Sequence, residues 1–203
     1  MANTREVLYL VNRPGNVVSH EGCVPWIDRA IELVRPYAGE ITLRGDTDFT
    51  LSAELDRWNS QGIKFIFGMD AHPKVVRLAE ALSQDAWQPL ERLARYEIAT
   101  EPRRTPQRIK EAIVRFKGYP NKKLVGESVA EFDYQPLKCG RKYRLVVVRK
   151  NISVQRGEVV LFEDIKYFFY ITNHTDYRAE QIVALANERC EQENVIEQLK
   201  NGV

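Results

Sequence analysis

The sequence predicts an α/β fold, and three features of the chain indicate it. Strand-like and helix-like runs alternate over the first 70 residues in the order β-α-β-α-β. Beyond about residue 90, runs of β-branched and aromatic residues are broken by turns, which is typical of antiparallel strands. A long helical pattern closes the chain. The 203 residues, 44% of them hydrophobic, suffice for one domain or for one domain with an inserted subdomain.

The first half of the chain predicts three strands and three helices. The strands are expected over 5–12, 40–46 and 63–70, and the helices over 25–37, 50–62 and 71–84. Pro25 suits the first turn of its helix, because proline lacks the backbone N–H that a first turn leaves unpaired. The helix over 50–62 is expected to start at Thr50 or Ser52 as its cap and to end at Gly62.

The second half predicts six strand-like runs and one helix. The runs cover 95–100, 112–119, 129–134, 142–152, 158–165 and 166–173. The closing helix is expected over 176–200, with Thr175 or Asp176 as its cap. We therefore interpret residues 1–90 and 166–203 as one core, interrupted by a β-rich insertion subdomain over 91–165.

Charge and cysteine usage narrow the class of protein. The formal net charge is only +2, but the segment from Arg103 to Lys123 holds eight Lys or Arg residues and a single acid, Glu111. The three cysteines are far apart and lack CxxC spacing, which argues against a disulfide framework or a structural zinc site. No signal-peptide pattern and no apolar stretch of about 18 residues is present. We expect a soluble, cytoplasmic protein with no membrane association.

Asp46 is the first candidate functional residue. It stands in "LRGDTDF", where a predicted strand ends, and ligands of open α/β sheets bind outside the carboxyl ends of strands. Gly45 lets the backbone approach closely at this point. The plainer interpretation, for the residue taken alone, is that Asp46 only caps a turn. Asp48, one step past the strand, suits the role of turn residue better.

The closing helix places charged residues beside its apolar stripe. At about 100° per residue, Ile182, Ala186, Arg189, Glu193 and Lys200 fall within an arc of roughly 60°. The simplest explanation is an Arg189–Glu193 ion pair on a solvated face, which contributes a few tenths of a kcal/mol. Glu193 fits that explanation poorly, because it borders the buried side.

The basic segment over 102–123 has two readings of equal weight. Clustered Lys and Arg residues, including Arg103, Arg104 and Arg108, suit contacts with nucleic-acid phosphates. A solvated connection into the insertion explains the same composition, and Pro102 and Pro106 are compatible with it.

Four blocks of the chain together resemble bacterial insertion-sequence transposases with a DDE catalytic domain. "RCEQENVIEQLKNG" is similar to the end of their Y-R-E-K signature, with Arg189, Glu193 and Lys200 at matching spacings and Ala186 where the signature has Tyr. "LRGDTDF", with Arg44 as its basic residue, looks like the motif around the family's second Asp. "GIKFIFGMD" and "NRPGNVVSHEG" are similar to counterparts in one branch of these elements.

The resemblance implies a ribonuclease H-like fold and metal-dependent phosphoryl transfer on DNA. Such domains hold Mg²⁺ (or Mn²⁺) with three carboxylates, of which Asp46 and Glu193 would be two. Arg189 and Lys200, together with Arg44, Arg103, Arg104 and Arg108, would contact DNA phosphates of transposon ends or target DNA. The resemblance implies a cytoplasmic, nucleoid-associated DNA transposase, for which a homodimer is one expected assembly.

One departure from the family pattern is clear. The family's first catalytic Asp lies on a strand upstream of the one that "REVLYLVN" resembles, and no Asp precedes Asp28 here. The resemblance therefore implies a fragment that lacks the first Asp and its strand. The alternative is a catalytically inactive transposase remnant that only binds DNA or a transposase partner. A metal-dependent nuclease with the same fold is a third reading, which the Arg, Glu and Lys spacing disfavours.

Overall fold

The computed structural model of the chain is built on one six-stranded mixed sheet. It describes residues 1–92, 113, 116, 121–156 and 159–188, apart from positions 2, 5, 12, 13 and 19. The strands are β1 (Thr42–Gly45), β2 (Lys64–Met69), β3 (Gln88–Pro89), β4 (Asn121–Tyr134), β5 (Tyr143–Arg156) and β6 (Val159–Thr172). The described fold is therefore α/β, as the sequence predicts.

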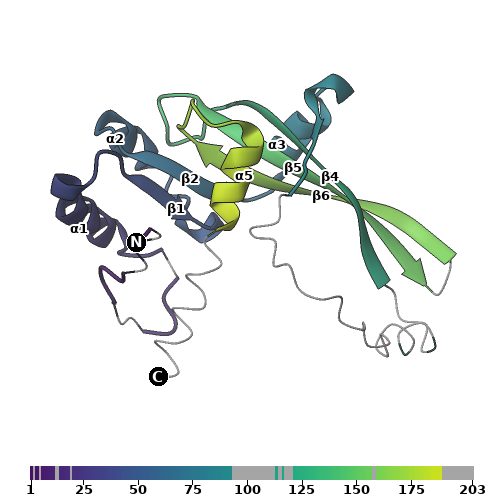
Figure 1. Cartoon of the computed structure of the whole chain (residues 1–203), viewed down its shortest axis with the longest axis horizontal. Coiled ribbons are helices and arrows are strands. Elements are labelled where there is room, and N and C mark those ends of the chain that lie inside the picture. The colour runs from purple at the N-terminus through teal and green to yellow at the C-terminus, as the bar shows by residue number, and fades with distance from the viewer. Residues whose placement is uncertain are drawn as a thin grey trace, which may run out of the picture.

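The sheet joins two kinds of strand pairing. Its order is β1-β2-β6-β5-β4-β3, in which β1 and β2 are parallel and all other neighbours are antiparallel. Strands β4, β5 and β6 have 14 residues each, and their far ends reach well beyond the helices (Figure 1). We call this part of the sheet the long ribbon.

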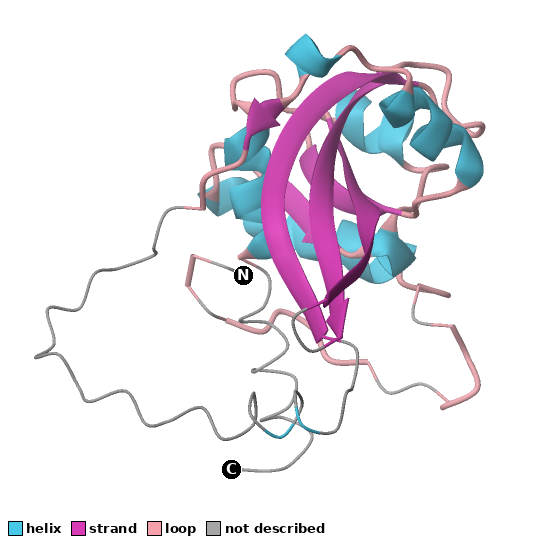
Figure 2. Cartoon of the chain, turned by 90° about the vertical axis from the view of Figure 1, so that its right-hand side faces the viewer, coloured by secondary structure: helices cyan, strands magenta, loops and turns pink. Residues whose placement is uncertain are grey.

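Helices cover both faces of the sheet (Figure 2). The helices are α1 (Val24–Val34), α2 (Leu55–Ser60), α3 (Pro73–Glu80) and α5 (Ala179–Asn187), with short 3₁₀ turns η1 (Arg35–Tyr37), η2 (Thr47–Phe49) and η3 (Gln84–Ala86). On one face, residues of α1, α2 and α3 pack in a core cluster with Phe65, Phe67 and Phe169. On the other face, α5 packs with Ile66, Val146 and Val148.

The alternation of side chains along β2 explains this arrangement. Phe65 and Phe67 face the first cluster, whereas Ile66 faces α5. A strand covered on both faces is buried continuously, and β2 is buried from Phe65 to Gly68.

Most predicted elements of the first half are confirmed, and one is wrong. Strands β1 and β2 and helices α2 and α3 lie inside the predicted ranges, and α1 begins one residue before its range, at Val24. The strand expected over 5–12 is not formed, because residues 6–11 are irregular and Val7, Leu10 and Val11 are exposed. An apolar run becomes a strand only where a neighbouring strand accepts its backbone hydrogen bonds.

Two predicted helix caps are also wrong. Helix α2 follows Glu54, which makes no side-chain capping hydrogen bond, so neither Thr50 nor Ser52 caps it. Gly62 follows this helix with a φ of 76°, as expected for a helix terminator. Helix α5 begins after Arg178, whose backbone N–H donates to the Gln181 side chain at 2.9 Å, and neither Thr175 nor Asp176 is the cap.

The β-rich region differs from the prediction in how its strands are divided. The runs expected over 158–165 and 166–173 form the single strand β6, without a turn between them. Ile113 and Phe116 are helical where a strand over 112–119 is expected. The run over 95–100 lies outside the described residues. The division into a core and an insertion at 91–165 stays a prediction, and β6 runs through its second boundary.

Candidate functional site

Asp46 directly follows β1 and is held by a local turn. It is the N-cap of η2, and its Oδ1 accepts a hydrogen bond from the backbone N–H of Asp48 at 3.2 Å. The predicted capping role is therefore confirmed for Asp46 rather than for Asp48, which is exposed within η2. A carboxylate offers about four lone-pair sites, so capping a turn is compatible with a functional role.

Two glycines let the ends of β1 and β2 come together around Asp46. A Cβ atom on Gly68 would lie 3.1 Å from the backbone N of Thr47 and 3.2 Å from the carbonyl carbon of Asp46. A Cβ atom on Gly45 would lie 2.9 Å from the Cβ of Phe49. The close approach predicted for Gly45 is confirmed, and Gly68 adds a second close approach that sequence reasoning missed.

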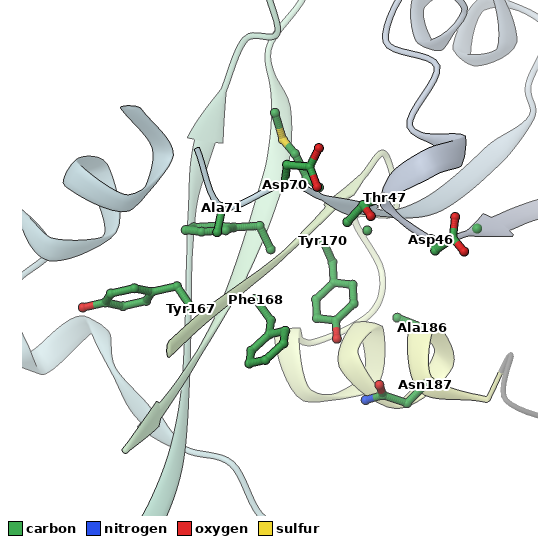
Figure 3. Close-up of a pocket in the computed structure, with 13 residues that line it drawn as sticks. Asp46, Thr47, Asp70, Ala71, Tyr167, Phe168, Tyr170, Ala186 and Asn187 are labelled. Atoms are coloured by element: carbon green, nitrogen blue, oxygen red, sulfur yellow. The ribbon is translucent and has the colours of Figure 1, made fainter. Parts of the chain in front are cut away.

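A pocket of about 280 Å³ opens beside Asp46 (Figure 3). Four parts of the chain line it: the end of β1 with Asp46 and Thr47, the end of β2 with Asp70 and Ala71, the β6 segment 167–170, and the end of α5 with Ala186 and Asn187. The pocket thus lies outside the carboxyl ends of the two parallel strands, where α/β sheets bind ligands.

Asp70 is a second carboxylate of this pocket, and sequence reasoning missed it. It follows β2 just as Asp46 follows β1, and Figure 3 shows both among the pocket residues. The signal was present in "FGMD", where a buried strand ends at an Asp. Asp46 and Asp70 come from neighbouring parallel strands, so the sheet brings together two acids that are 24 positions apart in sequence.

Six of the predicted site residues lie outside the described residues. Glu193, Arg189 and Lys200 lie beyond residue 188, and Arg103, Arg104 and Arg108 lie in the gap between 92 and 113. Within the described ranges, no group of three His, Cys, Asp or Glu side chains is arranged to hold a metal ion.

The apolar side of the closing helix is confirmed as far as the structure describes it. Ile182 and Ala186 are 0% and 7% exposed, and both belong to the α5 cluster. Ala186 also lines the pocket, so the side of α5 that carries Ile182 is the side that reaches the site.

Arg44 makes its described contacts within the chain. Its Nη1 donates to the carbonyl oxygen of Leu185 at 2.7 Å and to Oε2 of Glu188 at 2.9 Å, and its side chain is 13% exposed. DNA binding by Arg44 therefore stays a prediction, and these contacts instead connect β1 to α5.

The described cysteines offer no activated thiol at the pocket. Burial raises the pKa of the Cys139 thiol to about 11, and the Sγ of Cys139 donates to the carbonyl of Ser52 at 3.0 Å. A thiol with a raised pKa is not ionised near neutral pH, so it is a poor nucleophile. The acidic groups that line the pocket are the carboxylates of Asp46 and Asp70.

Carboxylates at the ends of adjacent parallel strands of an α/β sheet are typical of a ligand- or metal-binding site. Comparison with known protein families identifies the class of protein more narrowly. The model of the family described as "Transposase DDE domain group 1" matches residues 2–203. The chain belongs to this family, as the sequence motifs predict, and its family places it in DNA transposition. No curated protein and no solved structure gives a match.

Helix length provides one further observation. None of the helices in the described part of the chain is both long and apolar enough to cross a membrane.

Proposed function

We propose that the chain carries the metal-dependent catalytic site of a DNA transposase, with Asp46 and Glu193 as two of its acidic residues. The observation that carries the proposal is the position of Asp46, in a pocket at the carboxyl ends of two parallel strands. Membership in the transposase family supports an activity that cleaves and joins DNA strands.

The donor set of the pocket fits a hard divalent cation such as Mg²⁺ or Mn²⁺. Asp46 and Asp70 both line the pocket and offer only oxygen ligands. Mg²⁺ binds through few protein carboxylates and keeps several waters, so a pocket of this volume with two acids is suitable. When bound, such ions activate the attacking oxygen and stabilise the leaving oxygen of a phosphodiester.

Helix α5 supports the assignment of Glu193. Ala186 faces the pocket, and Glu193 follows it by seven residues, which is two turns of an α-helix. In the helix that the sequence predicts over 176–200, this spacing puts Glu193 on the same side as Ala186. We propose that it completes the acidic set begun by Asp46.

Several basic residues are proposed to bind the DNA backbone. In the helix that the sequence predicts over 176–200, Arg189 and Lys200 fall on the side of Glu193. Arg103, Arg104 and Arg108 stand in the most basic segment of the sequence. Contacts from Lys and Arg to phosphates position DNA without reading its sequence. The proposed partners are therefore transposon-end and target DNA.

We further propose that the sheet is a ribonuclease H-like core. The parallel pair β1 and β2, an Asp directly after β1, and a closing helix packed against β2 support this assignment. In this proposal, residues 1–90 and 166–203 form the core, and residues 91–165 form an insertion.

A nicking assay tests the proposal. The purified chain would be incubated with supercoiled plasmid DNA and Mn²⁺, together with the variants Asp46→Asn and Glu193→Gln. We expect nicked circles from the unaltered chain and none from either variant, because each variant removes a carboxylate charge from the ion site.

Asp48→Asn is the matched control, since Asp48 is an exposed neighbour of Asp46 that does not line the pocket. This variant is expected to nick DNA normally. Nicking that persists in both Asp46→Asn and Glu193→Gln would contradict the proposal, as would an unaltered chain that never nicks.

A further inference from the structure

Arg44 connects the strand that carries Asp46 to the end of α5. It stands two residues before Asp46, and its guanidinium binds both the Leu185 carbonyl and the Glu188 carboxylate. Leu185 and Glu188 flank Ala186 and Asn187, the two α5 residues that line the pocket. One side chain therefore joins the part of α5 that lines the pocket to the strand that leads into Asp46.

The apolar contacts of α5 do not supply the same constraint. Ile182 and Val183 are buried against Ile66, Val146 and Val148. Hydrophobic contact is non-directional and tolerates a small slide or rotation of a helix. The Arg44 contacts are directional, because the planar guanidinium donates along fixed N–H directions.

The hydrogen bond from Arg44 to Leu185 is better shielded from water than the ion pair between Arg44 and Glu188. The Arg44 side chain is 13% exposed, whereas that of Glu188 is 50% exposed. An exposed ion pair alone would contribute little, since water screens it. The bond to the Leu185 carbonyl at 2.7 Å is partly buried and joins the Arg directly to the helix backbone.

We infer that Arg44 is a positioning residue for the divalent-cation site, holding the end of α5, with Ala186 and Asn187, in place beside Asp46. This inference rests on the proposed function, in which Asp46 and Glu193 bind the same ion. In this role Arg44 contacts neither the ion nor DNA.

Arg144 supplies a matched control at the other end of α5. Its side chain is 19% exposed, binds Glu131, and donates to the carbonyl oxygens of His174 and Tyr177, just before the helix begins. Arg44→Met and Arg144→Met each remove a guanidinium that binds one carboxylate and at least one nearby backbone carbonyl. The two variants should therefore lower Tm by similar amounts, but only Arg44 lies beside the pocket.

The experiment measures Mn²⁺ binding by calorimetry, and free Mn²⁺ by electron paramagnetic resonance, for the full chain and these variants. We expect Arg44→Met to raise the Mn²⁺ dissociation constant about tenfold, and Arg144→Met to leave it unchanged. The double variant Arg44→Glu with Glu188→Arg should recover part of the lost affinity, because the ion pair is rebuilt with its charges exchanged.

The outcomes separate this inference from the proposed function. An unaltered chain that binds no Mn²⁺ overturns the proposed function and this inference with it. Tight binding by the unaltered chain and equally tight binding by Arg44→Met overturn the inference alone. Equal weakening in Arg44→Met and Arg144→Met also overturns it, because that result shows a general effect of lost stability.

A second variant covers the case in which Arg44→Met does not fold. Glu188→Gln removes only the half-exposed partner of the pair, so the fold should persist. Its Mn²⁺ dissociation constant is expected to rise about threefold. An unchanged constant in this folded variant counts against the inference.

Discussion

The two ends of the sheet are covered differently, and the candidate site lies at the more completely covered end. Beside the parallel pair β1 and β2, helices pack on both faces, and β2 is buried at four successive residues. Along the far part of the long ribbon, Leu124, Phe162 and Ile165 are each at least half exposed. A carboxylate pair must be held in a fixed geometry to bind an ion, and packing on both faces supplies that rigidity.

The largest expected difference between the two ends concerns aromatic side chains. Trp58 is 0% exposed, packs near Phe67, and donates its indole N–H to Asp28 at 3.1 Å. Trp58→Ala should lower the free energy of unfolding by about 3–5 kcal/mol. Phe162→Ala in the ribbon should lower it by less than about 1 kcal/mol, because Phe162 is 57% exposed. Urea denaturation of both variants measures the difference, and equal losses would show that the ribbon is packed as tightly as the core.

Glycine substitutions should sharpen the same comparison. A Cβ atom on Gly68 would press on the Asp46–Thr47 backbone, whereas a Cβ atom on Gly126 in β4 would meet nothing within 4 Å. Gly68→Ala is expected to destabilise the chain by about 1–3 kcal/mol and to weaken Mn²⁺ binding, because the turn at Asp46 must shift. Gly126→Ala is expected to stabilise it by about 0.4–1 kcal/mol. Thermal melts and Mn²⁺ titrations of the two variants check both signs; normal Mn²⁺ binding by Gly68→Ala would be evidence against the tight turn.

A smaller effect is expected from the ion pairs at the base of the ribbon. The Glu127 side chain is 8% exposed and accepts hydrogen bonds from Arg92 at 2.6 Å and 2.9 Å, with Lys150 at 3.2 Å. The hydrogen bonds from Arg92, followed by the contact with Lys150, hold the pKa of Glu127 below its usual value of 4.5. Glu127→Gln should cost about 1–2 kcal/mol, since Arg92 remains partly solvated.

The lowered pKa of Glu127 also sets a pH dependence. The folded state binds the Glu127 proton less readily than the unfolded state does, so this contribution is complete above the usual pKa of 4.5. It is lost as the pH falls through the lower pKa of the folded state. Urea melts between pH 6 and pH 3, about the range of this titration, should therefore show a steeper loss for the unaltered chain than for Glu127→Gln. Parallel curves would mean that Glu127 does not titrate in this way.

Sequence reasoning predicted the site best where a local pattern was sufficient. Asp46 at the end of β1, Gly62 after α2 and the buried side of α5 each depend on a few neighbouring residues, and each was found. Pattern alone failed where the outcome depends on a distant partner. The run over 5–12 has strand-like composition, yet its described residues pair with no strand.

Asp70 and Gly68 show the same limit from the other side. Their importance arises from the pairing of β1 with β2, which brings residues 68–70 against residues 45–47. Nothing in the local sequence of either strand states which strand lies beside it. Spacing along the sequence likewise does not predict the contact of Arg44 with α5, which joins residues 141 positions apart.

Calorimetric titration of Mn²⁺ into the purified chain, with Asp46→Asn and Asp48→Asn in parallel, tests the central claim most directly. We expect saturable Mn²⁺ binding by the unaltered chain and by Asp48→Asn. Asp46→Asn should lose Mn²⁺ binding while the thermal melt of this variant stays cooperative. Equal Mn²⁺ binding by Asp46→Asn and the unaltered chain would contradict the account, because the pocket at the ends of β1 and β2 would then not be the cation site.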